Sequence, residues 1–221
     1  RFGTVLTDAD VLVESTIGSY LFTTFEDAGF YGEEYERDRI SAYFPPEAAY
    51  QITLDPINGT LFFKDGLRIF DIILTIRQNG RFVAVVDYLP HFGRFYIGIG
   101  DKGAFTTTVE ALKNHVAWQS FRLGETPRII LTQRAPEEQV LKLRAAGFRA
   151  VELEKDYQPS PDWTLATKSI LDGGVAGYVK NEGHFIDWGA LGFLASLAGG
   201  AWNDPTFDPE TGRGKMVVAA S

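Results

Sequence analysis

The stretch Leu54-Asp55-Pro56-Ile57-Asn58-Gly59-Thr60 decides how this chain is interpreted. An acid stands at the end of a short apolar run, residues 50–54, and the following proline fixes its own φ angle. Gly59 allows a close backbone approach to a ligand, and Thr60 supplies a hydroxyl. A helix beginning at Thr60 would aim free N–H groups at an anion, so we expect a loop that holds metal and phosphate. The alternative is a plain surface turn, because Asp-Pro and Asn-Gly are common turn dipeptides.

Four further motifs accompany this loop at suitable spacing. They are Thr7-Asp8-Ala9-Asp10, Gly32-Glu33-Glu34, Gly103-Ala104-Phe105, and Ile186-Asp187-Trp188-Gly189-Ala190 leading to Ala198-Gly199-Gly200. Together with the loop, and in this order, they resemble the inositol monophosphatase family of magnesium-dependent, lithium-sensitive sugar-phosphate phosphatases. The resemblance spans nearly the whole chain. Family members usually carry another helix before the first motif, and we expect that N-terminal helix to be missing here.

Composition excludes several other classes of protein. Asp plus Glu number 29 against 21 for Lys plus Arg, a net charge of −8, which argues against a nonspecific nucleic-acid binder. The chain has no cysteine, so a disulfide framework and a thiol nucleophile are ruled out. No apolar run reaches the roughly 20 residues of a membrane span, and no signal peptide is visible. We therefore expect a cytoplasmic protein with no membrane partner.

The first half of the chain predicts a helix followed by antiparallel strands. Apolar residues recur every four positions at Val13, Ile17, Leu21 and Phe25, which predicts an amphipathic helix over residues 8–26. Glu33 then falls on a strand or loop edge, and residues 34–46 read as an exposed flap. The β-branched runs 67–76 and 82–88 flank Gln78-Asn79-Gly80, a strong hairpin signal, and a strand over 94–99 completes a meander.

The second half predicts alternating strands and helices. Proline near its start and Gly147 just past its end mark a helix over 136–146. Strands are expected over 128–132, 148–153, 175–179 and 215–220, and further helices over 163–171 and 188–198. This order favours an α+β fold, and the resemblance implies the layered αβαβα sandwich of the inositol monophosphatase and fructose-1,6-bisphosphatase type. We expect one domain over residues 1–221, with possible lobes at 1–125 and 126–221.

Phosphate-ester hydrolysis fits acids at separate chain positions, because magnesium prefers hard oxygen ligands and divalent metals both neutralise phosphate and activate water. The resemblance implies that Glu33 and Asp55 ligate metal, together with the backbone carbonyl of Ile57 and the late acid Asp187. It implies two or three Mg²⁺ ions, which Mn²⁺ could replace. For Asp187 the competing interpretation is an N-cap of the helix after it.

The same comparison implies phosphate and third-metal positions. Gly59 and Thr60 match the phosphate-cradling pair, and Thr60 also matches the residue that orients the attacking water. Asp10 matches an acid near a weakly held third metal, with a solvated helix face as the competing interpretation. Glu33, Asp55 and Thr60 are thus the expected catalytic residues.

Asn58 departs from the family pattern, which has a metal-ligating aspartate at that position. An amide offers one neutral oxygen, so magnesium binding should be weaker. Three interpretations compete. The chain is a natural protein with weak or lost activity, or an active enzyme that uses other acids such as Glu34 or Asp65, or a variant altered to trap a substrate.

Lys180 stands where many inositol-specific members carry an acid that holds ring hydroxyls. Lysine donates but cannot accept, and its charge favours an anionic group. We therefore predict poor use of inositol phosphate and preference for a more anionic substrate, such as a bisphosphate; the alternative is a solvent-facing lysine. His184 is expected to have a structural hydrogen-bonding role.

The leading interpretation is a metal-dependent phosphomonoesterase that hydrolyses a small sugar, inositol or nucleotide phosphate. The alternative is an inactive phosphatase-fold protein that binds a phosphorylated ligand or a protein partner. The resemblance also implies a homodimer.

Overall fold

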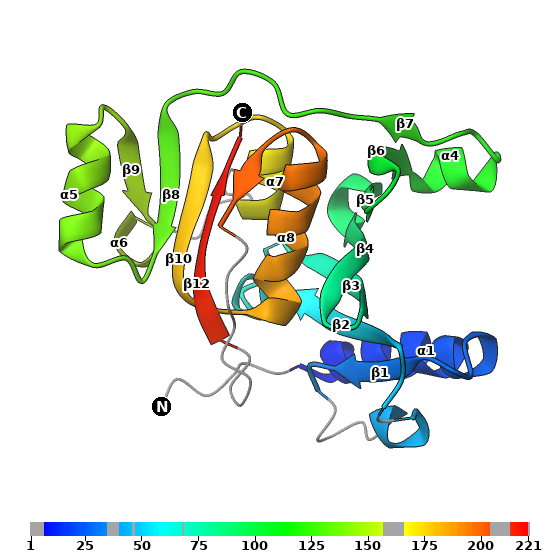
Figure 1. Cartoon of the computed structure of the whole chain (residues 1–221). Helices are drawn as coiled ribbons and strands as arrows, with labels where there is room; N and C mark the ends of the chain where they lie inside the picture. Colours follow the sequence, from blue (N-terminus) through cyan, green and yellow to red (C-terminus); the bar gives the residue numbers. More distant parts are fainter. Residues whose placement is uncertain are drawn as a thin grey trace. The chain divides into compact units, whose positions relative to one another are not determined.

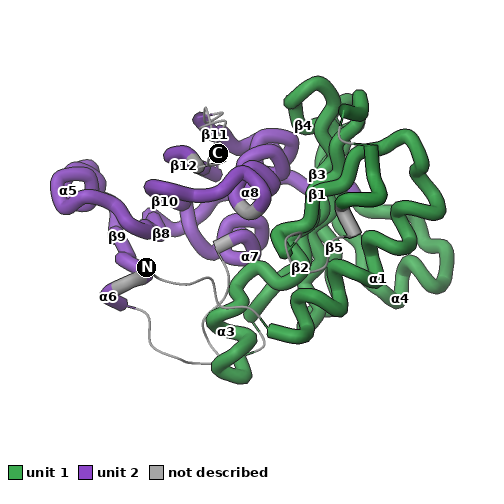
Figure 2. Tube along the Cα trace, turned by 90° about the horizontal axis from the view of Figure 1, so that it is seen from below, with its two compact units in different colours: residues 1–119 green, residues 120–221 purple. Residues whose placement is uncertain are grey.

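The computed structural model describes residues 7–34, 40–45, 47–67, 69–156, 166–203 and 213–220. Within these ranges the side chains of residues 40, 41, 154, 166, 187 and 213 are not described. Contacts between Cα atoms divide the chain into two compact units, residues 1–119 and 120–221 (Figure 2). The predicted lobe boundary lay at 125/126. Each unit is described by itself.

The first unit is built on one mixed sheet whose strands lie in chain order (Figure 1). Its strands are β1 (Gly29–Gly32), β2 (Tyr50–Asn58), β3 (Asp71–Gln78), β4 (Arg81–Leu89), β5 (Arg94–Ile99), β6 (Gly103–Thr108) and β7 (Gln119–Ser120). β1 and β2 are parallel, whereas the pairs from β2 to β6 are antiparallel. The predicted meander is confirmed, and β6 was not anticipated.

The hairpin between β3 and β4 follows from its turn residues. Asn79 and Gly80 have φ angles of 50° and 80°, a pair that Asn-Gly adopts readily and that matches the twist of the strands. The strand before the turn begins at Asp71 rather than at residue 67. Residues 65–66 form a turn after α3 (Thr60–Lys64), and residues 67, 69 and 70 have no regular structure, so the strand starts later than predicted.

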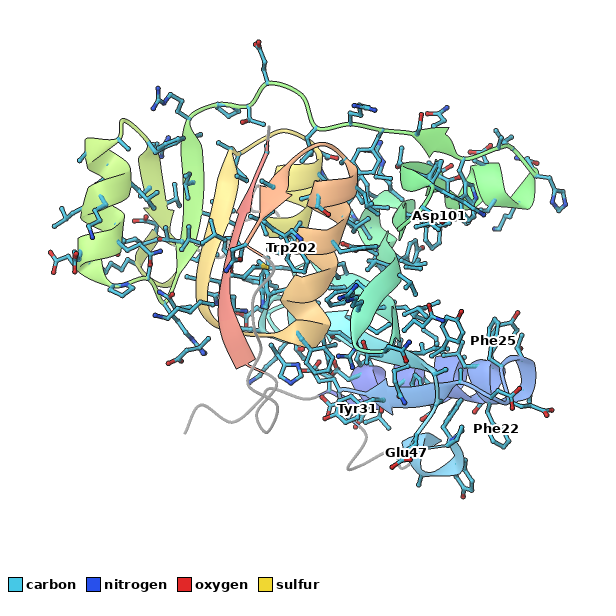
Figure 3. The ribbon with its side chains drawn as sticks, viewed as in Figure 1. Phe22, Phe25, Tyr31, Glu47, Asp101 and Trp202 are labelled. Atoms are coloured by element: carbon cyan, nitrogen blue, oxygen red, sulfur yellow. The ribbon has the colours of Figure 1, made fainter. Side chains whose placement is uncertain are left out.

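Helix α1 (Asp8–Thr24) covers the β1–β2 end of this sheet, and its buried stripe differs from the predicted one. The buried residues are Asp10, Glu14, Gly18 and Leu21. Phe25, expected to face the core, follows the helix and is 49% exposed. Figure 3 labels Phe22 and Phe25 at the C-terminal end of α1. The apolar period was misleading because two acids, which sequence patterns assign to solvent, face inward.

Short elements complete the first unit: η1 (Ile40–Tyr43), α3 (Thr60–Lys64), η2 (Pro90–Phe92) and α4 (Val109–Lys113). Its core cluster joins Leu21 of α1 to Phe30 of β1 and to Ile52 and Leu54 of β2. Phe44 packs into the same cluster, with its ring 5.0 Å from that of Phe30. This core fixes the parallel β1–β2 pair that carries two of the predicted acids.

The second unit has a five-stranded sheet in the order β11-β12-β10-β8-β9. Its elements are β8 (Ile129–Gln133), α5 (Glu137–Ala145), β9 (Arg149–Glu152), α6 (Leu153–Asp156), α7 (Ala166–Leu171), β10 (Gly177–His184), α8 (Phe185–Leu197), β11 (Ala201–Trp202) and β12 (Arg213–Ala219). β8 is parallel to β9 and β10, and β12 is antiparallel to β10 and β11. The predicted alternation of strands and helices is confirmed.

Helix α8 is the apolar core helix of this unit. Leu194 and Ala195 are fully buried, and Gly192 lets the indole of Trp202, labelled in Figure 3, lie against the helix. A Cβ at Gly192 would stand 1.9 Å from that ring. The helix begins at Phe185 rather than at the predicted Trp188, because β10 runs directly into it.

The α+β class is therefore confirmed, while the stacking of layers between the two units stays a prediction. Among the described helices, none combines the length and apolar content that a membrane span requires.

Candidate functional site

The parallel β1–β2 pair brings Glu33 and Asp55 to the same sheet edge. Gly32 pairs with Leu54, and the Glu33 amide donates to the Leu54 carbonyl at 2.9 Å. Glu33 and Asp55 are therefore the next residues on two neighbouring strands that run in the same direction. Asp55 is 2% exposed, and Glu33 is half-buried. The carboxyl ends of parallel strands are where α/β proteins commonly bind ligands.

A third acid, Glu14 of α1, supports the turn that carries Glu33. Its Oε2 accepts the Glu34 amide at 2.9 Å, and its side chain is fully buried. Gly32 makes room for it, since a Cβ there would stand 2.0 Å from the Glu14 carboxyl carbon. The alternative acid Glu34 is thus held through its backbone beside Glu33. Residues 35–39 of the predicted flap, which spans 34–46, lie outside the described residues.

A β-bulge in β2 sets which loop side chains share a face. Asp55 pairs with Ile73 and Asn58 pairs with Asp71, so three steps along β2 match two steps along β3. Side chains of a regular strand alternate between faces, and residues three apart would point in opposite directions. The extra residue resets that alternation and places Asp55 and Asn58 on one face of the sheet.

The loop itself is held by short-range hydrogen bonds. Asp55 Oδ1 accepts the Ile57 amide at 3.1 Å, and Thr60 Oγ1 donates to the Ile57 carbonyl at 2.8 Å. Gly59 adopts a left-handed φ of 94°, which other residues reach only with strain. The helix expected at Thr60 is present as α3. The loop is therefore a turn in which Asp55 bonds the backbone amide of Ile57 and Thr60 bonds its carbonyl.

Asn58 lies against a pair of buried acids that the sequence motifs did not include. Its Nδ2 donates to Asp71 Oδ1 at 2.7 Å. Asp87 of β4 lies diagonally across the ladder from Asp71, and both acids are fully buried. Burial, the charge of Asp71 and a hydrogen bond with Asp71 together raise the pKa of Asp87 well above its usual value.

This pKa shift makes a stability prediction. The folded protein keeps the Asp87 proton where the unfolded chain has lost it, so folding stability falls as pH rises from the unfolded pKa, about 4, toward the raised folded pKa. Asp87→Asn retains a donor for Asp71 and does not titrate. We expect the unfolding free energy of the variant, relative to the wild type, to increase between about pH 4 and neutral pH. Urea unfolding at several pH values measures it, and a difference independent of pH would contradict it.

Asp10 is buried rather than on a solvated helix face, which corrects that alternative. Its Oδ2 accepts the amide and the hydroxyl of Thr7, each at 2.7 Å, and closes a capping box at the start of α1. This role explains the acid without metal. Its assignment to a third metal stays a prediction.

The late motif lies in the second unit. Asp187 stands in the first turn of α8, and its side chain is outside the described residues. The N-cap of α8 is His184, whose Nδ1 accepts the Ile186 amide at 3.4 Å, so Asp187 is not the N-cap. The structural role expected for His184 is confirmed. The Lys180 ammonium lies over the Trp188 ring, 3.8 Å from its centre, so this lysine is not simply solvent-facing.

Asp65, the other alternative acid, ends α3 and is exposed. Glu14, Asp71 and Asp87 were missed because each stands within an apolar or β-branched pattern. The signal was available: Asp87 follows Val85 by two residues, which predicts the same buried strand face. An acid that falls on the buried face of a predicted strand is therefore a candidate site residue.

The oxygen donors at the β1–β2 edge suit a hard divalent cation. Glu33 and Asp55 offer carboxylates, and the Ile57 carbonyl keeps a second lone pair beside the one used by Thr60. In the part of the chain that the structure describes, no three acid or histidine side chains form a ready metal cage.

Comparisons with known proteins agree with the sequence motifs. A solved structure of the extragenic suppressor protein suhB from Bartonella henselae has a TM-score of 0.70 at 17% identity, over 98% of this chain and 81% of that chain. An IMPase/NADP phosphatase complexed with NADP and Ca²⁺ also gives 0.70 at 17% identity, over 100% and 79%. These likenesses establish a shared fold.

A curated relative adds a phosphatase. Histidinol-phosphatase of Chlorobaculum parvum is 28% identical over 105 residues, which span 48% of this chain and 38% of that protein. The sequence profile of the inositol monophosphatase family matches residues 2–221. On that match across its length, the chain belongs to the inositol monophosphatase family.

Proposed function

We propose that this protein is a metal-dependent phosphomonoesterase. The observation that carries the proposal is that Glu33 and buried Asp55 directly follow Gly32 and Leu54, the last pair of the parallel β1–β2 ladder, beside a glycine-threonine loop. Family membership and the histidinol-phosphatase relative support a phosphatase. A structurally similar phosphatase is complexed with Ca²⁺, which supports a divalent cation as the cofactor.

Glu33, Asp55, the Ile57 carbonyl and the Asn58 amide oxygen would hold Mg²⁺, with Asp187 added on the strength of its motif alone. Bound there, the cation supplies charge neutralisation for phosphate oxygens and lowers the pKa of water. Asp55 is fixed for this role by the Ile57 amide, which restricts its carboxylate. Mn²⁺ could replace Mg²⁺, and Asp10 is proposed only for a weakly held third ion.

Phosphate would be received by the turn at Gly59 and Thr60. The Thr60 hydroxyl donates a hydrogen bond to the Ile57 carbonyl. The lone pairs of the Thr60 oxygen are therefore available to accept a hydrogen bond from the attacking water. The backbone at Gly59 carries no side chain that would keep a phosphate oxygen away. These residues thus bind and orient, while the carboxylates hold the charge.

For the substrate we propose a small phosphorylated metabolite richer in anionic groups than inositol monophosphate. Lys180 is the residue that motivates this choice, and its stacking on Trp188 limits where the ammonium can lie. Lys180→Gln should lower kcat/KM about fivefold for a bisphosphate and much less for a monophosphate, because a screened charge contact is worth about 1 kcal/mol. Equal losses on both substrates would contradict this role. A homodimer is proposed from the family resemblance alone, and a cytoplasmic location from the sequence features given above.

The proposal is tested by phosphate release from a panel of sugar, inositol and nucleotide phosphates. We expect release that requires Mg²⁺ or Mn²⁺ and disappears with a chelator. No release from any substrate, together with retained binding of a phosphorylated ligand, would instead identify a binding protein of phosphatase fold.

Thr60→Val tests the role of the hydroxyl. Valine keeps the shape of threonine and removes the oxygen, so the water-orienting contact is lost while the carboxylates remain. We expect kcat to fall about 100-fold, because the attacking water is no longer held in its reactive position, with little change in Mn²⁺ affinity. Thr106→Val, which removes a β6 hydroxyl that donates to the Phe95 carbonyl of β5, is the control. A parallel loss of Mn²⁺ affinity in Thr60→Val would assign the hydroxyl to the metal site instead.

A further inference from the structure

We propose that Asp71 is a positioning residue that holds the Asn58 amide in one orientation. The loop carries the amide and β3 carries the acid, and we call this arrangement of Asn58 and Asp71 the exchanged pair. The acid that the loop lacks at position 58 is present across the ladder at position 71, and the amide takes its place in the loop. This inference rests on the proposed function, since it concerns how the same loop binds a cation.

The hydrogen bond between the two residues fixes the orientation of the amide. A carboxylate only accepts, so the Asn58 atom that faces Asp71 Oδ1 at 2.7 Å must be the donor Nδ2. The Asn58 oxygen is then turned away from Asp71. Within the described part of the chain, the Asn58 side chain makes this one hydrogen bond, and its oxygen accepts none. An oriented amide oxygen is a hard ligand of the kind that Mg²⁺ accepts.

The strand register makes this contact specific. Asn58 is paired with Asp71 because of the bulge in β2, which also places Asn58 on the face of Asp55. Without the bulge, the residue opposite Asp71 would be Ile57, whose side chain cannot bond a carboxylate. The contact is therefore built by the same irregularity that assembles the loop.

Because Asp87 lies beside Asp71, restoring an acid at position 58 alone is expected to be unfavourable. Asp71 and Asp87 are fully buried and interact with each other, and among the described residues no other donor reaches either Asp87 oxygen. An aspartate at position 58 would add a third carboxyl group within hydrogen-bond distance of Asp71. Like charges that share a buried site are strongly disfavoured. Asn58→Asp, the simplest change toward the family pattern, should thus weaken the site unless Asp71 changes too.

The test compares the wild type with Asn58→Asp, Asp71→Asn and the double variant Asn58→Asp/Asp71→Asn. Asn79→Asp, in the exposed β3–β4 turn, and Asp65→Asn, at the exposed end of α3, are controls for the same chemical changes. Mn²⁺ affinity is measured by electron paramagnetic resonance on each purified protein. Thermal unfolding in chelator is measured in parallel, because it reports the Asn58–Asp71 contact without any metal.

We expect Asp71→Asn and Asn58→Asp each to weaken Mn²⁺ binding about 10- to 100-fold, the usual cost of disturbing a residue that orients a ligand. The double variant should recover to the wild-type affinity or exceed it. In chelator, Asn58→Asp should lower Tm by about 4 °C or more, and the added Asp71→Asn should restore most of it. Should Asn58→Asp not fold, recovery of a folded double variant carries the same information.

Two results would overturn the inference. One is Asn58→Asp binding Mn²⁺ tighter than both the wild type and the double variant. The other is additive Tm changes in chelator, since independent sites add. A wild type that neither binds Mn²⁺ nor releases phosphate refutes the proposed function instead, and the unfolding cycle then decides the Asn58–Asp71 pairing alone.

Discussion

Asp55→Asn is expected to reduce Mg²⁺-dependent phosphate release by at least about a hundredfold, because a metal's stabilisation of transition-state charge is worth several kcal/mol and depends on this ligand. The substitution is isosteric and keeps an oxygen that can accept the Ile57 amide, so the turn should survive. What is lost is one negative charge at a buried position beside Glu33. Phosphate release under saturating substrate, followed as a function of Mg²⁺ concentration, measures the effect.

Asp65→Asn is the matched control, and it also tests the alternative acid. Asp65 is exposed at the end of α3, so this variant should retain wild-type activity. If Asp65→Asn lost activity while Asp55→Asn kept it, the metal site would have to be moved to the end of α3. Equal unfolding temperatures for both variants would exclude a folding defect as the cause.

Gly32→Ala should give the largest loss of stability among single-methyl additions at the site. The new Cβ would stand 2.0 Å from the Glu14 carboxyl carbon and 2.1 Å from its Oε1, so the buried side chain must move. Overpacking costs about 1–3 kcal/mol, and the charge-assisted bond from the Glu34 amide to Glu14 adds about 1.5–3 kcal/mol if it breaks. We expect the unfolding free energy to fall by about 3 kcal/mol or more, and metal affinity with it, because Glu33 lies within this turn.

Gly124→Ala provides the comparison for this substitution. Nothing lies within 4 Å of a Cβ at that position, so the added methyl group should leave the unfolding free energy nearly unchanged. Chemical unfolding of both variants in chelator separates the packing effect from metal binding. A Gly32→Ala protein as stable as Gly124→Ala would mean that Glu14 is not packed against the β1 turn.

Features that depend on neighbouring residues followed from the sequence. Asn79-Gly80 identified the hairpin, because few residues reach its positive φ angles without strain. Proline and glycine marked the ends of α5, and the strand expected over residues 94–99 as the end of the meander is β5. The loop from Asp55 to Thr60 was recognised for the same reason, since its chemistry lies within seven consecutive residues.

Only the tertiary structure decided which side chains meet at that loop. Asn58 faces Asp71 because one extra residue in β2 shifts the register against β3, and no local pattern announces such a shift. Glu14 and Asp87 face inward because the groups they contact, on β1 and β3, come from segments distant along the chain. Alternation and periodicity describe one segment at a time, whereas the cost of burying an acid is set by the partners that other segments bring to it.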